Sequence, residues 1–409
     1  MTRVPRAGDM LEQPLFGRRL RQLRQQQGKA QTELAGPGMS AAYLSRLESG
    51  HRPPTKRAVA YLAERLQVPI EAFGVNKPAS LVDVLATAQV STGADHDLRQ
   101  QLAAALDAAL NVDPGLRWQA HARLATLGAA EGDREAEQSH VEALVAVSDE
   151  LGHAALQVHS RLRLARSLRG RGELVEARAT AREGLELGRR AALTSPDITR
   201  CKLLLASATA ELGDLAEAAR LSEEICAELR GRRGPLAAEA LWTAATLASR
   251  KGMTERSSLL MVEAIDALDS REDLLLWMRL RLAAAALALR GGPPDLLHAE
   301  RYLTQVRPAL DLMGSPLHEQ EYASLWAQLA YRKGNFDEAA ALCEAAWEGR
   351  DHLTFRDRVR LEMLNEQIRS KQSGTWDQAR LAELATEAQE RGILDLAAEI
   401  WRALAEIRP

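Results

Sequence analysis

Residues 31–54 read QTELAGPGMSAAYLSRLESGHRPP and predict two short helices separated by a tight break. The first helix spans Gln31 to Ala35 and is expected to end at Gly36-Pro37-Gly38, because glycine and proline interrupt helices. Ser40 is a suitable N-cap for the second helix, since its hydroxyl can accept a hydrogen bond from the first helical turn. The pattern therefore predicts a helix, a turn and a second helix within 24 residues.

The second of these helices has one apolar face and several small outward-facing residues. Tyr43, Leu44 and Leu47 fall on one side, because residues three and four positions apart share a helical face. The remaining sides carry Ala41, Ala42, Ser45, Arg46 and Ser49. A short helix with small outer residues and a single arginine is suited to entering a DNA major groove.

The run that contains both helices resembles a Cro/lambda-repressor-type helix-turn-helix domain of the Xre family over residues 15–73. The resemblance rests on residues at the family's spacing, namely Gln31, Leu34-Ala35, Leu44-Ser45-Arg46-Leu47-Glu48, Gly50, Arg52, Pro54 and Leu62-Ala63. It implies an all-α, five-helix, lambda-repressor-like DNA-binding domain. The segment between Ala35 and Ser40 is one residue shorter than usual in the family, so the angle of the second helix, the recognition helix, is left open.

The resemblance also implies roles for single residues. Gln31 would contact a phosphate while supporting the recognition helix, and Arg52 would hold a backbone phosphate. The residues that would face base edges are Ser40, Ala41, Ala42, Ser45 and Arg46. Among these, Arg46 alone can make a bidentate contact, most naturally to guanine O6 and N7. The alternative is that Arg46 lies over its own domain or pairs with Glu33.

Two more residues have a structural role by the same resemblance. In the family, a carboxylate at the position of Glu48 pairs with an arginine of the first helix, here Arg24, beneath the recognition helix. We therefore expect Arg24 and Glu48 to hold the domain together and not to read bases.

The overall composition indicates a long helical chain with a basic head. The chain has 409 residues, of which only 4% are aromatic, and this favours helices packed through Ala and Leu over sheets. Residues 1–76 hold twelve Lys or Arg against six Asp or Glu, a net charge of +6, so the remainder carries −9 of the total of −3. A basic head on an acidic body fits a DNA-binding module, although a basic arm can also be merely solvated.

The sequence also bears on the cellular compartment. The three cysteines Cys201, Cys226 and Cys343 are far apart in apolar helical contexts and read as reduced thiols of a cytoplasmic protein. The N-terminus lacks an apolar signal segment, and no stretch reaches the roughly 18 apolar residues of a membrane span. We therefore expect a cytoplasmic protein without a membrane partner.

The remainder of the chain repeats with a period of about 40 residues. Glycines recur between helical runs at positions 93, 132, 172, 213, 252, 292, 334 and 374. Seven residues before six of them stand Ala125, Ala165, Ala206, Ala245, Ala285 and Ala327. Five residues after glycine stand the small residues Ala177, Ala218, Ser257, Ala339 and Ala379. Small residues at fixed points let antiparallel helices approach closely.

This repeat resembles a tetratricopeptide (TPR) array. The clearest matches are the turns that begin at Gly334-Asn335-Phe336 and Gly213-Asp214-Leu215. The period exceeds the usual ~34 residues of such repeats, so longer helices or connections are expected. The domains are thus a flexible arm at 1–14, the helix-turn-helix domain at 15–73, a linker at 74–79 and a TPR-like helical domain at 80–409.

The sequence contains none of the common catalytic or metal-binding signatures. There is no GxxxxGK[ST] phosphate loop, no HExxH and no CxxC, and the nine histidines are scattered. We therefore expect no enzyme activity, no cofactor and no metal.

In a TPR array the first helices of the pairs line a concave surface. Counted back from the glycines, the residues that would line it are His159, Arg166, Arg200, Ser207, Trp242, Thr246, Arg279, Glu321, Gln328 and Tyr331. Of these, the candidates for effector binding are Arg166, Arg200, Trp242, Arg279, Gln328 and Tyr331. Arginines beside aromatic and amide groups suit an extended peptide or its carboxylate. Alternatively, these residues are only the polar side of an amphipathic repeat.

The order of the domains resembles that of the RRNPP group of peptide-sensing regulators. It implies a sequence-specific transcriptional regulator that binds double-stranded DNA, forms a homodimer and senses a peptide or protein effector. The alternative is a protein-interaction scaffold or antitoxin-like protein, whose head contacts protein and whose body recruits a partner.

Overall fold

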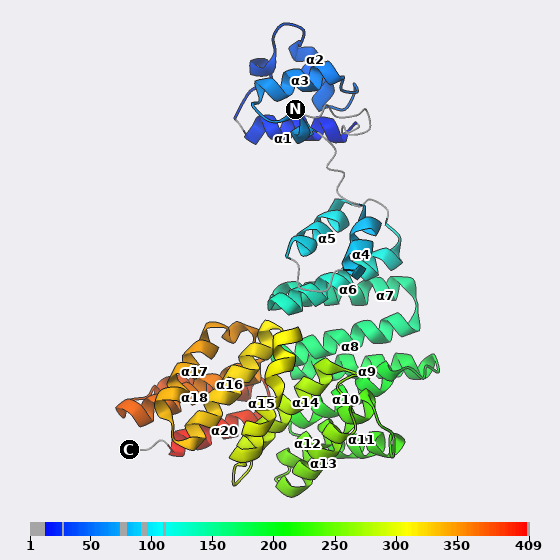
Figure 1. Cartoon of the computed structure of the whole chain (residues 1–409). Coiled ribbons are helices and arrows are strands. Elements are labelled where there is room, and N and C mark those ends of the chain that lie inside the picture. The colour runs from blue at the N-terminus through cyan, green and yellow to red at the C-terminus, as the bar shows by residue number, and fades with distance from the viewer. Residues whose placement is uncertain (1–12, 27, 74–79, 91–95, 109–111, 407–409) are drawn as a thin grey trace. The chain divides into compact units, whose positions relative to one another are not determined.

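The computed structural model describes residues 13–26, 28–73, 80–90, 96–108 and 112–406. Within these ranges the regular secondary structure is helical, apart from an isolated bridge between Gly36 and Met39. The predicted all-α class is therefore confirmed (Figure 1). The predicted linker at 74–79 and residues 1–12 of the predicted arm lie outside the described ranges.

The head has five helical segments, but only three of them are α-helices. They are α1 (Leu15–Gln26), the 3₁₀ helix η1 (Gln31–Leu34), α2 (Ala41–Glu48), α3 (Lys56–Arg65) and the 3₁₀ helix η2 (Ile70–Phe73). The predicted helix from Gln31 to Ala35 is thus a single 3₁₀ turn, since the chain has already left helical geometry at Ala35. These segments enclose one apolar core that includes the fully buried Phe16, Leu44, Leu62 and Phe73.

The break between η1 and α2 is a two-residue turn. Gly36 and Met39 exchange two backbone hydrogen bonds of 2.9 Å each. Pro37 and Gly38 stand at the tip, and Gly38 has a φ of +84°, which a side chain would make unfavourable. Proline followed by a glycine with positive φ is the pattern of a type II turn. The shortened segment is therefore closed by a turn of its own, and Ser40 caps α2 directly after it.

The body consists of paired helices that lie side by side in chain order (Figure 1). Two shorter helices precede it in the sequence, α4 (Leu81–Val90) and α5 (His96–Ala108). The pairs are α6 (Pro114–Glu131) with α7 (Arg134–Leu151), α8 (Ala154–Arg171) with α9 (Leu174–Arg190), α10 (Pro196–Glu211) with α11 (Leu215–Glu228), α12 (Pro235–Arg250) with α13 (Thr254–Asp266), α14 (Leu274–Arg290) with α15 (Leu296–Met313), α16 (Pro316–Lys333) with α17 (Phe336–Glu348), and α18 (Phe355–Ser373) with α19 (Gln378–Glu390). The last helix, α20 (Leu394–Glu406), packs on α19.

Small residues set how closely these helices pack. The six alanines that precede the turn glycines by seven positions are all completely buried. Ser257 is also buried, and its hydroxyl donates a 2.8 Å hydrogen bond to the carbonyl of Ala245 on the facing helix. Ala379 is an exception, since it is exposed near the start of α19. The first helices of the pairs have 16 to 19 residues, which accounts for the long repeat.

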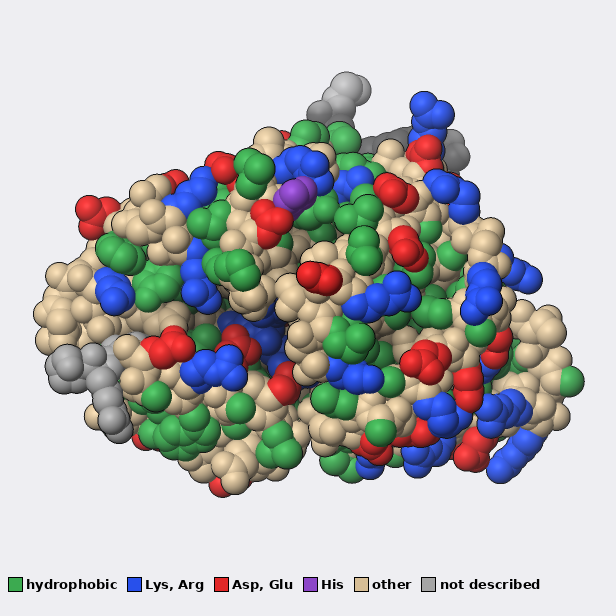
Figure 2. Space-filling model, turned by 90° about the horizontal axis from the view of Figure 1, so that it is seen from below, with side chains coloured by type: hydrophobic (Ala, Val, Ile, Leu, Met, Phe, Trp, Pro, Cys, Tyr) green, Lys and Arg blue, Asp and Glu red, His purple; other side chains and the backbone are tan. Residues whose placement is uncertain are grey.

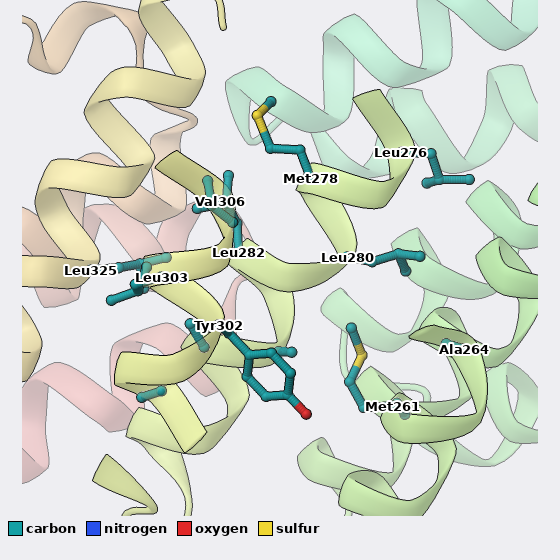
Figure 3. Packing of buried hydrophobic residues seen from close by; sticks show 14 of the residues in the cluster. Met261, Ala264, Leu276, Met278, Leu280, Leu282, Tyr302, Leu303, Val306 and Leu325 are labelled. Atoms are coloured by element: carbon teal, nitrogen blue, oxygen red, sulfur yellow. The ribbon is translucent and has the colours of Figure 1, made fainter. Parts of the chain in front are cut away.

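The middle of the body holds its largest apolar cluster, which spans α12 to α16. Leu303 and Val306 of α15 lie against Leu325 of α16 and Leu282 of α14 in Figure 3. Met261 of α13 fills the space on the other side of α14. Continuous packing of this kind joins neighbouring pairs into one unit.

The last pairs of the body also contact the first ones. Phe355, at the start of α18, lies against Gly172 at the end of α8, where an added Cβ would come within 3.1 Å of its ring. Arg391 donates a 3.0 Å hydrogen bond to the carbonyl of Arg171, which is 220 residues earlier in the chain. Leu174 of α9 packs in the apolar cluster of α18, α19 and α20. These contacts hold α18 and α20 against α8 and α9. No helix in the described ranges is both long and apolar enough to cross a membrane.

Candidate functional sites

A hydrogen-bonded group of three side chains holds α2 in the head. Arg24 of α1 donates to Glu48 from Nε at 2.6 Å and from Nη2 at 3.0 Å. Gln31 of η1 donates from Nε2 to the same carboxylate at 2.6 Å. The Glu48 side chain is only 3% exposed, so these donors replace the water it loses. The Glu48 hydrogen bond raises the pKa of Arg24. Arg24 and Glu48 therefore lie beneath α2, as the family resemblance implied.

The outer face of α2 is left open to solvent. Ser45 and Arg46 are exposed there, as are Ser40 and Ala42, while Ala41 is half-buried. Among the described residues, the Arg46 guanidinium has no hydrogen-bond or ion-pair partner, and Glu33 instead accepts a hydrogen bond from the backbone of Ala30. The Ser40 hydroxyl accepts a 3.2 Å hydrogen bond from the Tyr43 amide, so it caps the helix.

Arg52 lies in the loop that follows α2. Its guanidinium stacks over the Tyr43 ring, 5.3 Å from the ring centroid, and remains exposed. Its carbonyl accepts a 2.7 Å hydrogen bond from Gln13 Nε2, which also donates to Leu47 at 2.9 Å. Gln13 was expected in a flexible arm. It instead fixes the end of α2 against the start of α1, because its side-chain oxygen accepts from the Gly17 amide.

In the body, a row of paired polar and charged side chains joins three of the first helices. His159 of α8 hydrogen-bonds through Nδ1 to Asp197 of α10 at 2.9 Å. Arg200 of α10 lies 3.6 Å from Asp197 and donates to Glu239 of α12 at 3.1–3.2 Å. Both carboxylates of the row are therefore engaged. Asp197 and Glu239 were not among the predicted residues, although each precedes a predicted residue by three positions and so lies on the same helical face.

Arg166 and Arg279 lie beside this row. Burial by the surrounding protein lowers the pKa of Arg166, and the positive charges of Arg279 and Arg200 lower it further. The negative charge of Glu239 acts in the opposite direction and raises this pKa. Arg279 stacks over the Trp242 ring at 5.4 Å from its centroid. Four of the six effector candidates, Arg166, Arg200, Trp242 and Arg279, are thus brought together.

The other two candidates lie apart from that group. Gln328 forms a 3.4 Å hydrogen bond with Ser324 of its own helix. The Tyr331 ring packs against Phe336 of the same helical pair, with the ring centroids 5.6 Å apart. Both of these interactions therefore lie within their own helical pair.

Two charged residues outside the candidate set have strongly shifted pKa values. Burial and the charge of Asp357 raise the pKa of Glu321 on α16 to about 8. The positive charges of Arg279 and Arg134 oppose this rise. Burial and the charge of Arg360 lower the pKa of Arg290, at the end of α14, to about 9, although solvent reaches its side chain. Figure 2 shows a hollow in the body with Lys or Arg and Asp or Glu side chains at its floor. We refer to Arg166, Arg200, Glu239, Arg279 and Glu321 as the inner charged face.

Comparison with known proteins identifies the head and the fold of the body. Residues 15–73 match a helix-turn-helix domain family. None of the curated protein sequences compared matches the chain. The structure of a Rap protein complexed with Competence and Sporulation Factor is similar, with a TM-score of 0.54 and 8% identity over 96% of this chain and 97% of that one. NprR in complex with its cognate peptide NprX has a TM-score of 0.52 and 15% identity over 76% of this chain and 87% of that one. These likenesses show a shared TPR-like helical fold.

Proposed function

We propose that this chain, which joins a helix-turn-helix domain to a TPR-like helical body, is a transcriptional regulator that binds specific DNA sequences. The matched domain and folds are those of regulators rather than of enzymes. One observation supports the proposal most directly. Arg46 is unpaired among the described residues and stands on a helix whose underside is fixed by Glu48. A free guanidinium on a rigid helix is able to donate two hydrogen bonds to guanine.

The residues around α2 supply phosphate contacts in this proposal. Arg52 is held over Tyr43 at one end of the helix, with its guanidinium still exposed. Gln31 uses one of its two amide hydrogens on Glu48, which leaves the second for a phosphate oxygen. Lys56 and Arg57 are exposed at the start of α3 and add positive charge to the same domain. Phosphate contacts position a protein on DNA, while base contacts select the sequence.

The body supplies dimer contacts and an effector site in this proposal. Among the described residues, the inner charged face carries unpaired cations on α8 and α14. On α16 it carries the carboxyl group of Glu321, which has no hydrogen bond or ion pair among these residues and is mainly protonated near pH 7, because its pKa is about 8. A ligand with a carboxylate for the arginines and a neutral acceptor for this carboxyl group, such as a peptide, suits this arrangement. NprR was solved with its cognate peptide, but the likeness to it concerns the fold, so the effector proposal rests on the charges.

Selection from a pool of randomised DNA duplexes tests the DNA-binding proposal. The full chain should enrich one consensus sequence, and its affinity for that sequence should exceed its affinity for random DNA by at least 10³-fold at physiological salt. The affinity for random duplexes should fall steeply as salt rises, since it depends on released counterions. Weak binding without a consensus would instead favour a scaffold whose head contacts protein.

A further inference from the structure

Two guanidinium groups of the inner charged face have no hydrogen-bond acceptor in the part of the chain that the structure describes. Arg166 projects from α8 and Arg279 from α14, and both are exposed. Among the described residues, neither guanidinium takes part in a hydrogen bond or an ion pair within 4.0 Å. The two lie close enough for the charge of Arg279 to lower the pKa of Arg166, after the larger effect of burial.

The neighbouring carboxylates are already engaged by other groups. Glu239 receives its three hydrogen bonds from Arg200, and Asp197 is bonded to His159 and lies 3.6 Å from Arg200. Three guanidinium groups thus share two carboxylates, which leaves an excess of positive charge. Like charges held close together repel each other, and a bound anion removes that cost.

The Trp242 ring provides a wall for such an anion. Arg279 lies over this ring, so its planar guanidinium is oriented and can present its edge to a ligand. A guanidinium in a fixed orientation pairs well with a planar carboxylate through two parallel hydrogen bonds. We propose that Arg166 and Arg279 clamp a carboxylate of an acidic peptide beside Trp242 on the inner charged face.

Glu321 decides in favour of a peptide over a ligand with several negative charges. The charge of Arg279 is among those that act on Glu321, so its carboxyl group lies near the proposed clamp. With a pKa of about 8, the Glu321 carboxyl group is mainly protonated near pH 7 and can donate a hydrogen bond. A peptide can place a carboxylate at the arginines and a neutral backbone carbonyl at Glu321, whereas a polyphosphate offers only charged oxygens. This proposal rests on the effector part of the proposed function and names the chemistry of that effector.

A randomised heptapeptide pool tests the clamp. The full chain is incubated with the pool, and the bound peptides are sequenced by mass spectrometry. We expect enrichment of Asp or Glu at one position, at least tenfold over Asn or Gln there. Arg166→Gln and Arg279→Gln should each reduce that preference at least fivefold and leave the other positions unchanged. If the clamped group is instead the free C-terminal carboxylate of the peptide, a pool of C-terminally amidated peptides should not bind.

The control variant is Arg220→Gln, because Arg220 is exposed on α11 and its ion-pair partners among the described residues, Glu217 and Glu224, belong to its own helix. It should select the same peptides as the unaltered chain. Thermal unfolding checks the fold: removing one of two repelling charges should not lower the midpoint of Arg166→Gln or Arg279→Gln.

The outcomes separate the two proposals. An acidic preference that survives in both arginine variants overturns the clamp, as does selection of peptides without any acidic preference, while the effector proposal stands in either case. No enrichment of any peptide by the full chain overturns the clamp and the peptide effector together. In every case, the DNA selection described above tests the DNA-binding proposal independently.

Discussion

Glu48 of α2 accepts two hydrogen bonds from Arg24 of α1, at 2.6 and 3.0 Å, although the two residues are 24 positions apart. Gln31 adds a third donor to the same carboxylate. The group lies on the buried side of α2, opposite the exposed Arg46. The orientation of the base-facing surface therefore depends on a buried ion pair that does not itself reach the DNA.

Replacing Glu48 by alanine should destabilise the head before it affects base recognition. The change leaves the Arg24 guanidinium, which is 12% exposed, without its carboxylate. Breaking a buried ion pair by removing one partner costs about 3–5 kcal/mol. Hydrogen exchange of backbone amides in residues 15–73 of the full chain measures this effect. Unchanged exchange rates there would show that the pair contributes nothing to the stability of the head.

A matched control for this change is Glu64→Ala. Glu64 is exposed on α3, and its side chain has no hydrogen-bond or ion-pair partner among the described residues. Surface substitutions of this kind usually change stability by less than about 0.5 kcal/mol. The same exchange experiment should therefore show the unaltered pattern.

Arg46→Ala and Arg52→Ala should weaken DNA binding in different ways. Loss of a bidentate base contact costs about 1–3 kcal/mol at the specific site and relaxes the preference at one base pair. Loss of the phosphate contact expected of Arg52 should weaken all sequences alike and make the salt dependence shallower. Titrations on the selected consensus and on random DNA, at several salt concentrations, distinguish the two. Equal losses on both DNAs for Arg46→Ala would remove this residue from base recognition.

The head shows which features a sequence can predict. The Arg24–Glu48 contact was implied by the family resemblance, and the cap at Ser40 followed from residue type. The hydrogen bonds of Gln13 to Leu47 and Arg52 were not predicted. A glutamine within the expected arm carries no periodic signal, because its partners lie more than 30 residues away in the chain.

The body shows the same division between local and distant contacts. The alanine positions were predictable because they repeat with the helical pairs, and all six before the turn glycines are buried. Ala379 fits the second spacing, five residues after a glycine, but is exposed, so spacing alone does not ensure burial. The contact between Arg391 and Arg171 joins the last part of the array to its second pair. It depends on how the repeats curve, and this is the sum of many small rotations between neighbouring pairs.

A buried cluster of charges strengthens that contact between distant helices. Glu211 at the end of α10 accepts from Arg169 Nε at 2.8 Å and from Nη2 at 2.6 Å. Arg356 of α18 lies 3.7 Å from Glu211 and donates to Asp395 of α20 at 2.8 and 2.9 Å. Arg250 also pairs with Asp395. Arg356 thus connects the start of the last pair to a carboxylate in the first half of the array.

Because of this cluster, the stability of the body should decrease at acid pH. Burial alone would raise the pKa of Glu211, but the charges of Arg169, Arg356 and Arg250 hold it below its usual value. A carboxyl group whose pKa is lower in the folded state stabilises the fold at pH values above its unfolded-state pKa, which is about 4.3 for glutamate. This stabilisation is lost as the pH falls through the folded-state pKa. Glu211→Gln should cost about 3–5 kcal/mol at pH 7.

Thermal unfolding of the full chain at several pH values measures the effect. The difference in midpoint between the unaltered chain and Glu211→Gln should be constant above about pH 5 and shrink at lower pH. The control is Glu228→Gln, since Glu228 is half exposed and pairs with Lys202 at the surface. A difference for Glu211→Gln that stays constant down to pH 2 would show that its charge does not stabilise the fold.

The body should contribute the second head that a full DNA site requires. Helix-turn-helix proteins commonly bind as two-fold pairs whose half-sites are about 34 Å apart. On α2 of each head, Arg46 alone is able to make a bidentate base contact. A single half-site therefore offers little discrimination between DNA sequences. The core of the head contains residues of the range 16–73 alone, so a chain truncated after residue 77 retains that core.

Full-site and half-site binding should therefore separate the truncated chain from the whole one. Two linked heads gain affinity because the second binds at a high effective concentration, and this gain can reach 10²–10⁴-fold without any new contact. The whole chain should prefer the full site over the half-site by such a factor, whereas the truncated head should show almost no preference. Sedimentation of the whole chain at the same concentrations should show a dimer. If the truncated head binds the full site as tightly as the whole chain, the body does not bring the two heads together.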